Sequence, residues 1–156
     1  MNIKIINYIV NEAHFKANPL PQGVTNFTIK PNIRMDIKKE ARTLSLSITV
    51  TVKGSETEPV PFDLDVRLTG NFAILSPAAS VDELRIEASK TLYPYMRAYV
   101  ATITANANIV PYSLPVIDFD NAVATATKIV PGAAVSANPA KRGVDAITIR
   151  PVDEEV

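Results

Sequence analysis

A few acidic side chains and one histidine are the residues whose types and spacing could support chemistry in this chain. Asp63 and Asp65 lie two positions apart, so on a strand they share one face and could form an acid pair or bind a hard cation. Arg67 continues the same alternation, which favours a solvated ladder of opposite charges. His14 could act as a general base, but the sequence places neither a nucleophile nor an orienting carboxylate for it. We therefore interpret His14 as structural.

A second acidic pair, Asp118 and Asp120, lies in an Asp-Phe-Asp-Asn sequence. A calcium loop would need further ligands and a glycine that are missing here, so helix capping is the better interpretation. The chain has no cysteine, one histidine and five glycines, which argues against a thiolate nucleophile, a multi-histidine metal site and a glycine-rich phosphate loop. We expect neither an enzyme nor a protein with a cofactor or a metal.

The length and charge of the chain limit the class of protein further. Its 156 residues are enough for one domain with one core. Sixteen basic and sixteen acidic residues cancel, which argues against nucleic acid as a partner and against a polybasic membrane anchor. The N-terminal segment does not resemble a secretory signal, and no apolar run is long enough to insert into a membrane. These features predict a soluble, cytoplasmic protein.

Alternating apolar and polar residues predict four β-strands. The first covers residues 3–15, with room for a bulge, and the others lie around residues 33–37, 44–52 and 62–68. Gly70 interrupts the last pattern, which suggests a bulge or a bend before the strand continues. Short polar turns join the later strands, so we expect a four-stranded, antiparallel, meander-like sheet with one apolar face.

A long helix is predicted to follow the strands. Ser80 and Glu83 form a capping-box pattern, and apolar residues then recur at helical spacing to about residue 108. Pro94 should kink the helix, because it cannot donate to the carbonyl of Lys90. Small or uncharged residues off the main stripe form a second face that the sheet cannot cover, and this face predicts self-association. These residues are Tyr95, Ala98, Thr102 and Ala105.

The rest of the chain divides into three segments. The linker over residues 109–117 is apolar and proline-containing, and its side chains could equally pack in the core or bind a client. An alanine-rich second helix is predicted over residues 119–130 and would pack on the same face of the sheet. Residues 131–156 predict a mobile or partly ordered tail. The fold class is α+β, with a single domain over residues 1–130.

Two motifs in this region resemble a known family. The sequence LYPYMRAYVATIT at residues 92–104, followed by IVPYSLPVIDFD at residues 109–120, resembles the signature region of SecB-type export chaperones. The likeness extends upstream to PFDLDVRLTGNFAI at residues 61–74 and to the first strand, and it covers roughly residues 5–125. The motifs are moderately specific, since no catalytic signature accompanies them.

The resemblance implies a four-stranded sheet, chains that pair into dimers, and dimers that stack through the long helix into a homotetramer. The expected oligomer interface contains Tyr95, Tyr99, Thr102 and Ile103. Family members hold unfolded or precursor polypeptides in apolar grooves. Carried onto this chain, the client-binding residues are Leu20, Val24, Phe27, Tyr112, Leu114, Ile117, Phe119 and Val123.

The resemblance also raises the question of an export partner. In this family an acidic outer sheet face docks the export motor ATPase, and the matching positions are Glu12 and Asp65. Lys16 stands where another acid is expected, and the tail lacks the usual continuation of the last helix. The leading hypothesis is an ATP-independent holdase for non-native polypeptides. The alternatives are a dedicated chaperone for one partner, such as an antitoxin or a phage protein, and an enzyme that uses Asp63 and Asp65.

Overall fold

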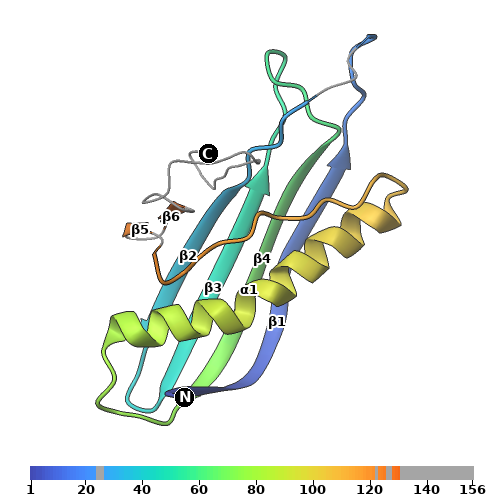
Figure 1. The fold of residues 1–156 in the computed structure, drawn as a ribbon. Helices are drawn as coiled ribbons and strands as arrows, with labels where there is room; N and C mark the ends of the chain where they lie inside the picture. Colours follow the sequence, from blue (N-terminus) through green and yellow to red (C-terminus); the bar gives the residue numbers. More distant parts are fainter. Residues whose placement is uncertain (24–26, 122, 126–127, 131–156) are drawn as a thin grey trace.

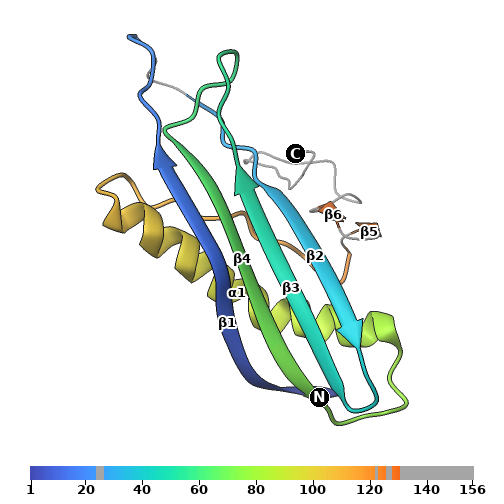
Figure 2. The ribbon, with the colours of Figure 1, turned by 180° about the vertical axis from the view of Figure 1, so that it is seen from behind.

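The computed structural model shows one antiparallel sheet that is covered on one face by a long helix and by the linker that follows it (Figure 1). It describes residues 1–23, 27–121, 123–125 and 128–130, and for the last two segments only the backbone. The predicted α+β class is therefore confirmed. Figure 2, the view from behind, shows that neither the helix nor the linker covers the opposite face of the sheet.

The four predicted strands are β1 (Ile3–Ala17), β2 (Asn32–Lys39), β3 (Thr43–Val52) and β4 (Phe62–Ile74). β2, β3 and β4 form the predicted antiparallel meander. β1 joins the sheet beside β4 rather than beside β2, so the strand order begins β1-β4-β3-β2. The long connection between β1 and β2 allows this, because it contains the prolines and the glycine that carry the chain across the end of the sheet.

The irregularities of the sheet lie in β1 and not at Gly70. Register shifts follow Ile5 and Val10 in β1, as a long bulged strand predicts. Gly70 itself pairs regularly with Tyr8 on one side and Leu46 on the other. A side chain at Gly70 would place its Cβ 2.9 Å from Leu92 Cδ1. The glycine is therefore explained by the close approach of the helix, and the bulge or bend predicted there is wrong.

Helix α1 (Val81–Asn106) has the ends that its sequence predicts. Ser80 and Glu83 form the complete capping box. At the other end Asn108 takes a left-handed conformation, and the amides of Asn108 and Ile109 bond back to the last turn, as in a Schellman motif. The helix continues through Pro94 and changes direction near its middle (Figure 1), as a proline kink predicts.

The core lies between the inner face of the sheet and the helix. Every second residue of β3 and β4 is buried, from Leu44 to Val52 and from Phe62 to Ile74. The helix contributes one stripe of buried residues, comprising Leu84, Ala88, Ser89, Leu92, Tyr93, Met96, Val100 and Thr104. The buried side chains of the strands and of the helix therefore pack together in one apolar layer.

The second helix predicted over residues 119–130 is wrong for the described part of that segment. Two short strands, β5 (Val123–Thr125) and β6 (Lys128–Val130), pair with each other, and Lys128 of β6 pairs with Arg34 at the edge of β2. Valine, isoleucine and threonine alternate with other residues here, and the edge of β2 offers unpaired backbone groups. These two factors outweigh the helix propensity of the alanines. The predicted tail at residues 131–156 lies outside the described residues.

Candidate functional site

The linker after α1 folds back along the helix as an extended segment, which we call the strap (residues 109–121). Near its start, the Tyr112 amide donates to Thr104 Oγ1 at 2.8 Å. Further along, Arg97 Nε donates to the Leu114 carbonyl at 3.1 Å. The strap therefore runs antiparallel to α1, as Figure 1 shows, and backbone groups outside regular structure find partners on the helix.

The far end of the strap is held by two more contacts with α1. The Tyr93 hydroxyl donates to the Pro115 carbonyl at 2.7 Å, and Lys90 Nζ forms an ion pair with Asp120 Oδ2 at 2.8 Å. Burial raises the pKa of Tyr93 well above its ordinary value, so this hydroxyl remains a donor. The helix residues that hold the strap follow helical spacing, which places them along one side of α1.

The strap has an inner and an outer side. Leu114, Ile117 and Phe119 point into the core and are almost fully buried. Val110 and Val116 are 86% and 79% exposed, which is unusual for large apolar side chains on an ordered segment. Apolar side chains of the same strap are therefore partly packed in the core and partly open to solvent.

A second apolar surface lies along β1, at the edge of the sheet. Between Lys4 and Glu12 this strand has no charged residue. Ile6, Tyr8, Ile9 and Val10 are all exposed, at 60%, 42%, 53% and 37%. Edge strands are usually protected by charges, prolines or a covering segment, and the stretch of β1 between Lys4 and Glu12 has no charge or proline.

Comparison with known proteins identifies the family. The model of the family described as "Preprotein translocase subunit SecB" matches residues 1–128. The chain belongs to the SecB family. A protein-export protein SecB of Mesorhizobium japonicum is 25% identical over 125 residues, covering 76% of this chain and 75% of its own length. An uncharacterized protein of Methanocaldococcus jannaschii, MJ0357, is 33% identical over 124 residues, covering 74% of this chain and 79% of its own length.

A solved structure shows the same fold as this SecB-family chain. The Mycobacterium tuberculosis SecB-like chaperone Rv1957, in complex with a ChAD peptide from the HigA1 antitoxin, aligns with a TM-score of 0.61 at 15% identity. The match covers 75% of this chain and 91% of that one. SecB-family proteins are chaperones and not enzymes, so the coarse function of this chain is that of a chaperone.

The other client-binding residues expected for a SecB-like chain are dispersed. Phe27 is 44% exposed, whereas Leu20 is half-buried. Tyr112 is also half-buried, and its ring centroid lies 5.9 Å from that of Phe62. Val24 lies outside the described residues, and only the backbone of Val123 is described, in β5. The exposed members of the expected set are therefore fewer than the sequence indicates.

The residues expected at the oligomer interface divide in a similar way. Tyr95 and Thr102 are exposed on α1, while Tyr99 and Ile103 are half-buried against the core. The Tyr95 ring lies 4.5 Å from the Tyr8 ring, centroid to centroid. The exposed face of the helix is thereby continuous with the apolar edge of β1.

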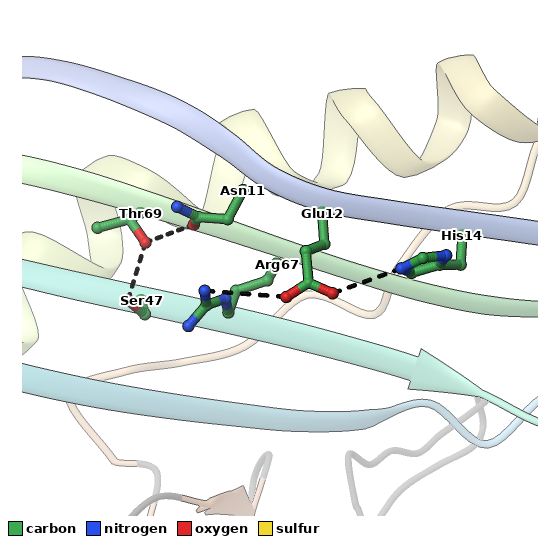
Figure 3. Close-up of polar contacts among 6 residues, drawn as sticks. All are labelled: Asn11, Glu12, His14, Ser47, Arg67 and Thr69. Carbon is green, nitrogen blue, oxygen red and sulfur yellow. Dashed lines mark hydrogen bonds and ion pairs between the residues drawn. The ribbon is translucent and has the colours of Figure 1, made fainter.

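The outer face of the sheet carries the residues expected to dock the export motor. Figure 3 shows Glu12 between Arg67 and His14: Arg67 Nη2 lies 3.9 Å from Glu12 Oε2, and His14 Nε2 lies 3.4 Å from Glu12 Oε1. Asp65 is exposed and pairs in register with His14. The sequence did not indicate the Glu12–His14 contact, although residues two apart on a strand share a face. Because both side chains are mostly exposed, we interpret it as a solvated pair.

Beside these charges, the outer faces of β1, β3 and β4 carry several uncharged polar side chains. Ser47 and Thr69 hydroxyls lie 2.9 Å apart, and Thr69 Oγ1 donates to Asn11 Oδ1 at 2.6 Å (Figure 3). Asn71 likewise donates to Asn7 at 2.8 Å. These cross-strand pairs tie β1 and β3 to β4 and leave a hydroxyl- and amide-rich surface.

Asp63, the other residue of the candidate acid pair, accepts hydrogen bonds that hold two loops together. Its Oδ1 accepts from the Gly54 amide at 2.9 Å and from Asn18 Nδ2 at 2.8 Å. These two hydrogen bonds lower the pKa of Asp63 below its ordinary 3.8. The carboxylate thus joins the loop after β1 to the turn between β3 and β4. Within the described residues no group of three metal-ligating side chains occurs.

We expect Asp63→Ala to lower the free energy of unfolding by about 1 kcal/mol at pH 7, because two donors lose a charged acceptor in a largely solvated place. A carboxylate whose folded pKa is lowered stabilises the fold above the unfolded pKa, and the effect is lost as pH falls through the folded pKa. The difference between wild type and variant should therefore shrink below about pH 4. Urea unfolding at pH 7 and pH 3 measures it, and the exposed Asp65→Ala is the matched control. A pH-independent difference would contradict the assignment.

No helix in the described part of the chain combines the length and hydropathy that crossing a membrane requires.

Proposed function

We propose that this SecB-family chaperone is an ATP-independent cytoplasmic holdase that binds non-native polypeptides through exposed apolar side chains of the strap. The supporting observation is the exposure of Val110 and Val116 on an extended segment that is held against α1. Phe27, in the loop after β1, offers a third exposed apolar side chain. Burial of such surface is worth about 25 cal/mol per Å² and demands no particular client sequence. Broad client recognition follows from that chemistry.

The same proposal includes assembly of several copies of the chain. A second copy that pairs along β1 would cover Ile6 and Ile9 and satisfy the edge of the sheet. The exposed helix face around Tyr95 and Thr102 would then be available for the stacking of two dimers. A dimer or a homotetramer would also bring several straps together, so that one client could contact more than one.

The experiment that tests the holdase function is suppression of aggregation by a strap variant. In the absence of ATP, wild type should delay aggregation of a denatured test protein. We expect the delay to be several-fold shorter with the double variant Val110→Ser, Val116→Ser, because this variant lacks apolar surface that a client would bury. The matched control is Leu75→Ser, Val81→Ser, which removes two exposed apolar side chains elsewhere. Light scattering with equimolar chaperone measures the effect.

Equal loss of activity in both double variants would contradict a role for the strap. Absence of suppression by the wild-type protein would contradict the holdase function itself. Because all four positions are exposed, both variants are expected to keep the unfolding midpoint of wild type, which urea titration checks.

One observation favours the second candidate function, a dedicated chaperone for one partner without binding to the export motor. Acidic residues of the outer face stand beside cations: Glu12 contacts Arg67, and Asp63 pairs in register with Lys16. These two acidic residues therefore stand beside cations, which reduces the acidic character expected of a motor-docking surface. If wild type protects one partner but none of several unrelated denatured proteins, the dedicated chaperone is the better description.

A further inference from the structure

The strap occupies the place where a client would gain most apolar contact. Leu114, Ile117 and Phe119, expected from the family resemblance to touch a client, are side chains of the strap and are buried against the core. Phe119 packs edge-on against Tyr93, with ring centroids 5.4 Å apart. In the single chain these three side chains are packed in the core, so they are not accessible to a client.

The strap is also attached in a way that permits release. It contributes no strand to the sheet, and Pro111 and Pro115 cannot donate backbone hydrogen bonds. Its described polar contacts with α1 include two side chains that donate to strap carbonyls, from Tyr93 and Arg97, and the exposed ion pair at Asp120. A segment held mainly by side chains opens more readily than one held in a ladder of backbone hydrogen bonds.

We infer that the strap is a displaceable cover, and that an extended apolar segment of a client takes the place of its three buried side chains. The strap itself indicates the kind of occupant that fits this place. It is extended, apolar and uncharged from Ile109 to Ile117, like an apolar segment of an unfolded polypeptide. Exchange of like for like leaves the buried apolar area nearly unchanged, so the balance rests on the polar contacts that hold the strap. This inference rests on the proposed holdase function and names how its site opens.

Tyr93 is the positioning residue that tests this inference with the smallest change. Tyr93→Phe keeps the ring against Phe119 and removes only the hydrogen bond to the Pro115 carbonyl. If clients bind only molecules whose strap has opened, their apparent affinity is the affinity for the open form multiplied by the fraction of molecules that are open. Loss of one hydrogen bond raises that fraction, so client binding should tighten by about fivefold. The matched control is Thr91→Val, which removes from α1 a hydroxyl that donates to the Glu87 carbonyl and not to the strap.

A crosslink tests the inference in the opposite direction. Lys90 and Asp120 end 2.8 Å apart, and the chain has no cysteine, so a short bismaleimide would join only Lys90→Cys to Asp120→Cys. The other end of the strap is covalently continuous with α1, so this crosslink prevents its release. We expect the crosslinked protein to lose most of its affinity for a fluorescently labelled, permanently unfolded protein. The same variant capped with N-ethylmaleimide should retain that affinity.

The outcomes separate this inference from the proposed function. Equal client affinity of the crosslinked and capped proteins would overturn the displaceable cover and leave the holdase intact. If the capped and wild-type proteins both fail to bind the unfolded protein, the holdase function is contradicted. Hydrogen exchange then tests, independently of client binding, whether the strap opens. Strap amides should exchange faster than those of β3 and β4, and about fivefold faster again in Tyr93→Phe. Strap exchange as slow as that of the sheet core would overturn the inference.

Discussion

Replacing Leu92 with alanine is expected to lower the free energy of unfolding by about 2–5 kcal/mol, the range for a large-to-small change in a closed core. Leu92 is fully buried near the middle of α1, and its side chain lies against Gly70 of β4. Its side chain fills the space above Gly70, so truncation leaves a cavity that the surrounding strands cannot close. Urea unfolding at one protein concentration measures the loss.

The same contact predicts a coupled effect with Gly70. Gly70→Ala alone should cost about 1–3 kcal/mol, because its Cβ would lie 2.9 Å from Leu92 Cδ1. In the Leu92→Ala background that space is vacant, so the added methyl group should cost little or restore some stability. The double variant should thus be more stable than the sum of the two single effects allows. Strict additivity would contradict the proposed reason for a glycine in β4.

If two chains pair along β1 as we propose, replacing Ile9 with lysine is expected to abolish most of that dimer at micromolar concentration. Ile9 lies on β1, is 53% exposed and pairs in register with Thr69 of the outer face, which neither the helix nor the linker covers (Figure 2). A lysine at an edge strand is a common means of preventing edge-to-edge pairing, because its charge would be desolvated by the neighbouring chain. The fold of the single chain should not change, since the position is solvated there.

Size-exclusion chromatography with light scattering measures this effect, and Leu75→Lys is the matched control because Leu75 is 51% exposed outside β1. The wild-type protein and the control should share one mass, and Ile9→Lys should be smaller. An unchanged mass in Ile9→Lys would exclude the edge of β1 as the interface. A monomeric wild type would contradict assembly itself.

Several features of the fold could be predicted from sequence because their causes are local. The capping box at Ser80 and Glu83 begins the helix, and the alternation in β3 and β4 defines one buried face. Pro94 marks the bend, and the motifs around it indicate the SecB family that the comparisons confirm. Each of these signals lies within a short window of residues.

Other features could not be predicted, because they depend on contacts between distant segments. The position of β1 beside β4 is set by the long connection to β2 and by the cross-strand partners of β1. The strands at residues 123–125 and 128–130 form where an edge of the sheet is available, although alanines there favour a helix. Gly70 indicates a bulge in the sequence but is explained by Leu92, which lies on another element.

The sequence by itself therefore determined the family, the first four strands, the long helix and the fact that this chain has more apolar surface than one helix and one sheet can bury. Only the tertiary structure decided which residues of that surface are buried. In the strap, Leu114 and Ile117 are buried and Val116 is exposed, and no periodicity in the sequence separates them. The physical reason is that an irregular segment has no repeating geometry, so the direction of each side chain is set by the helix residues that hold its backbone.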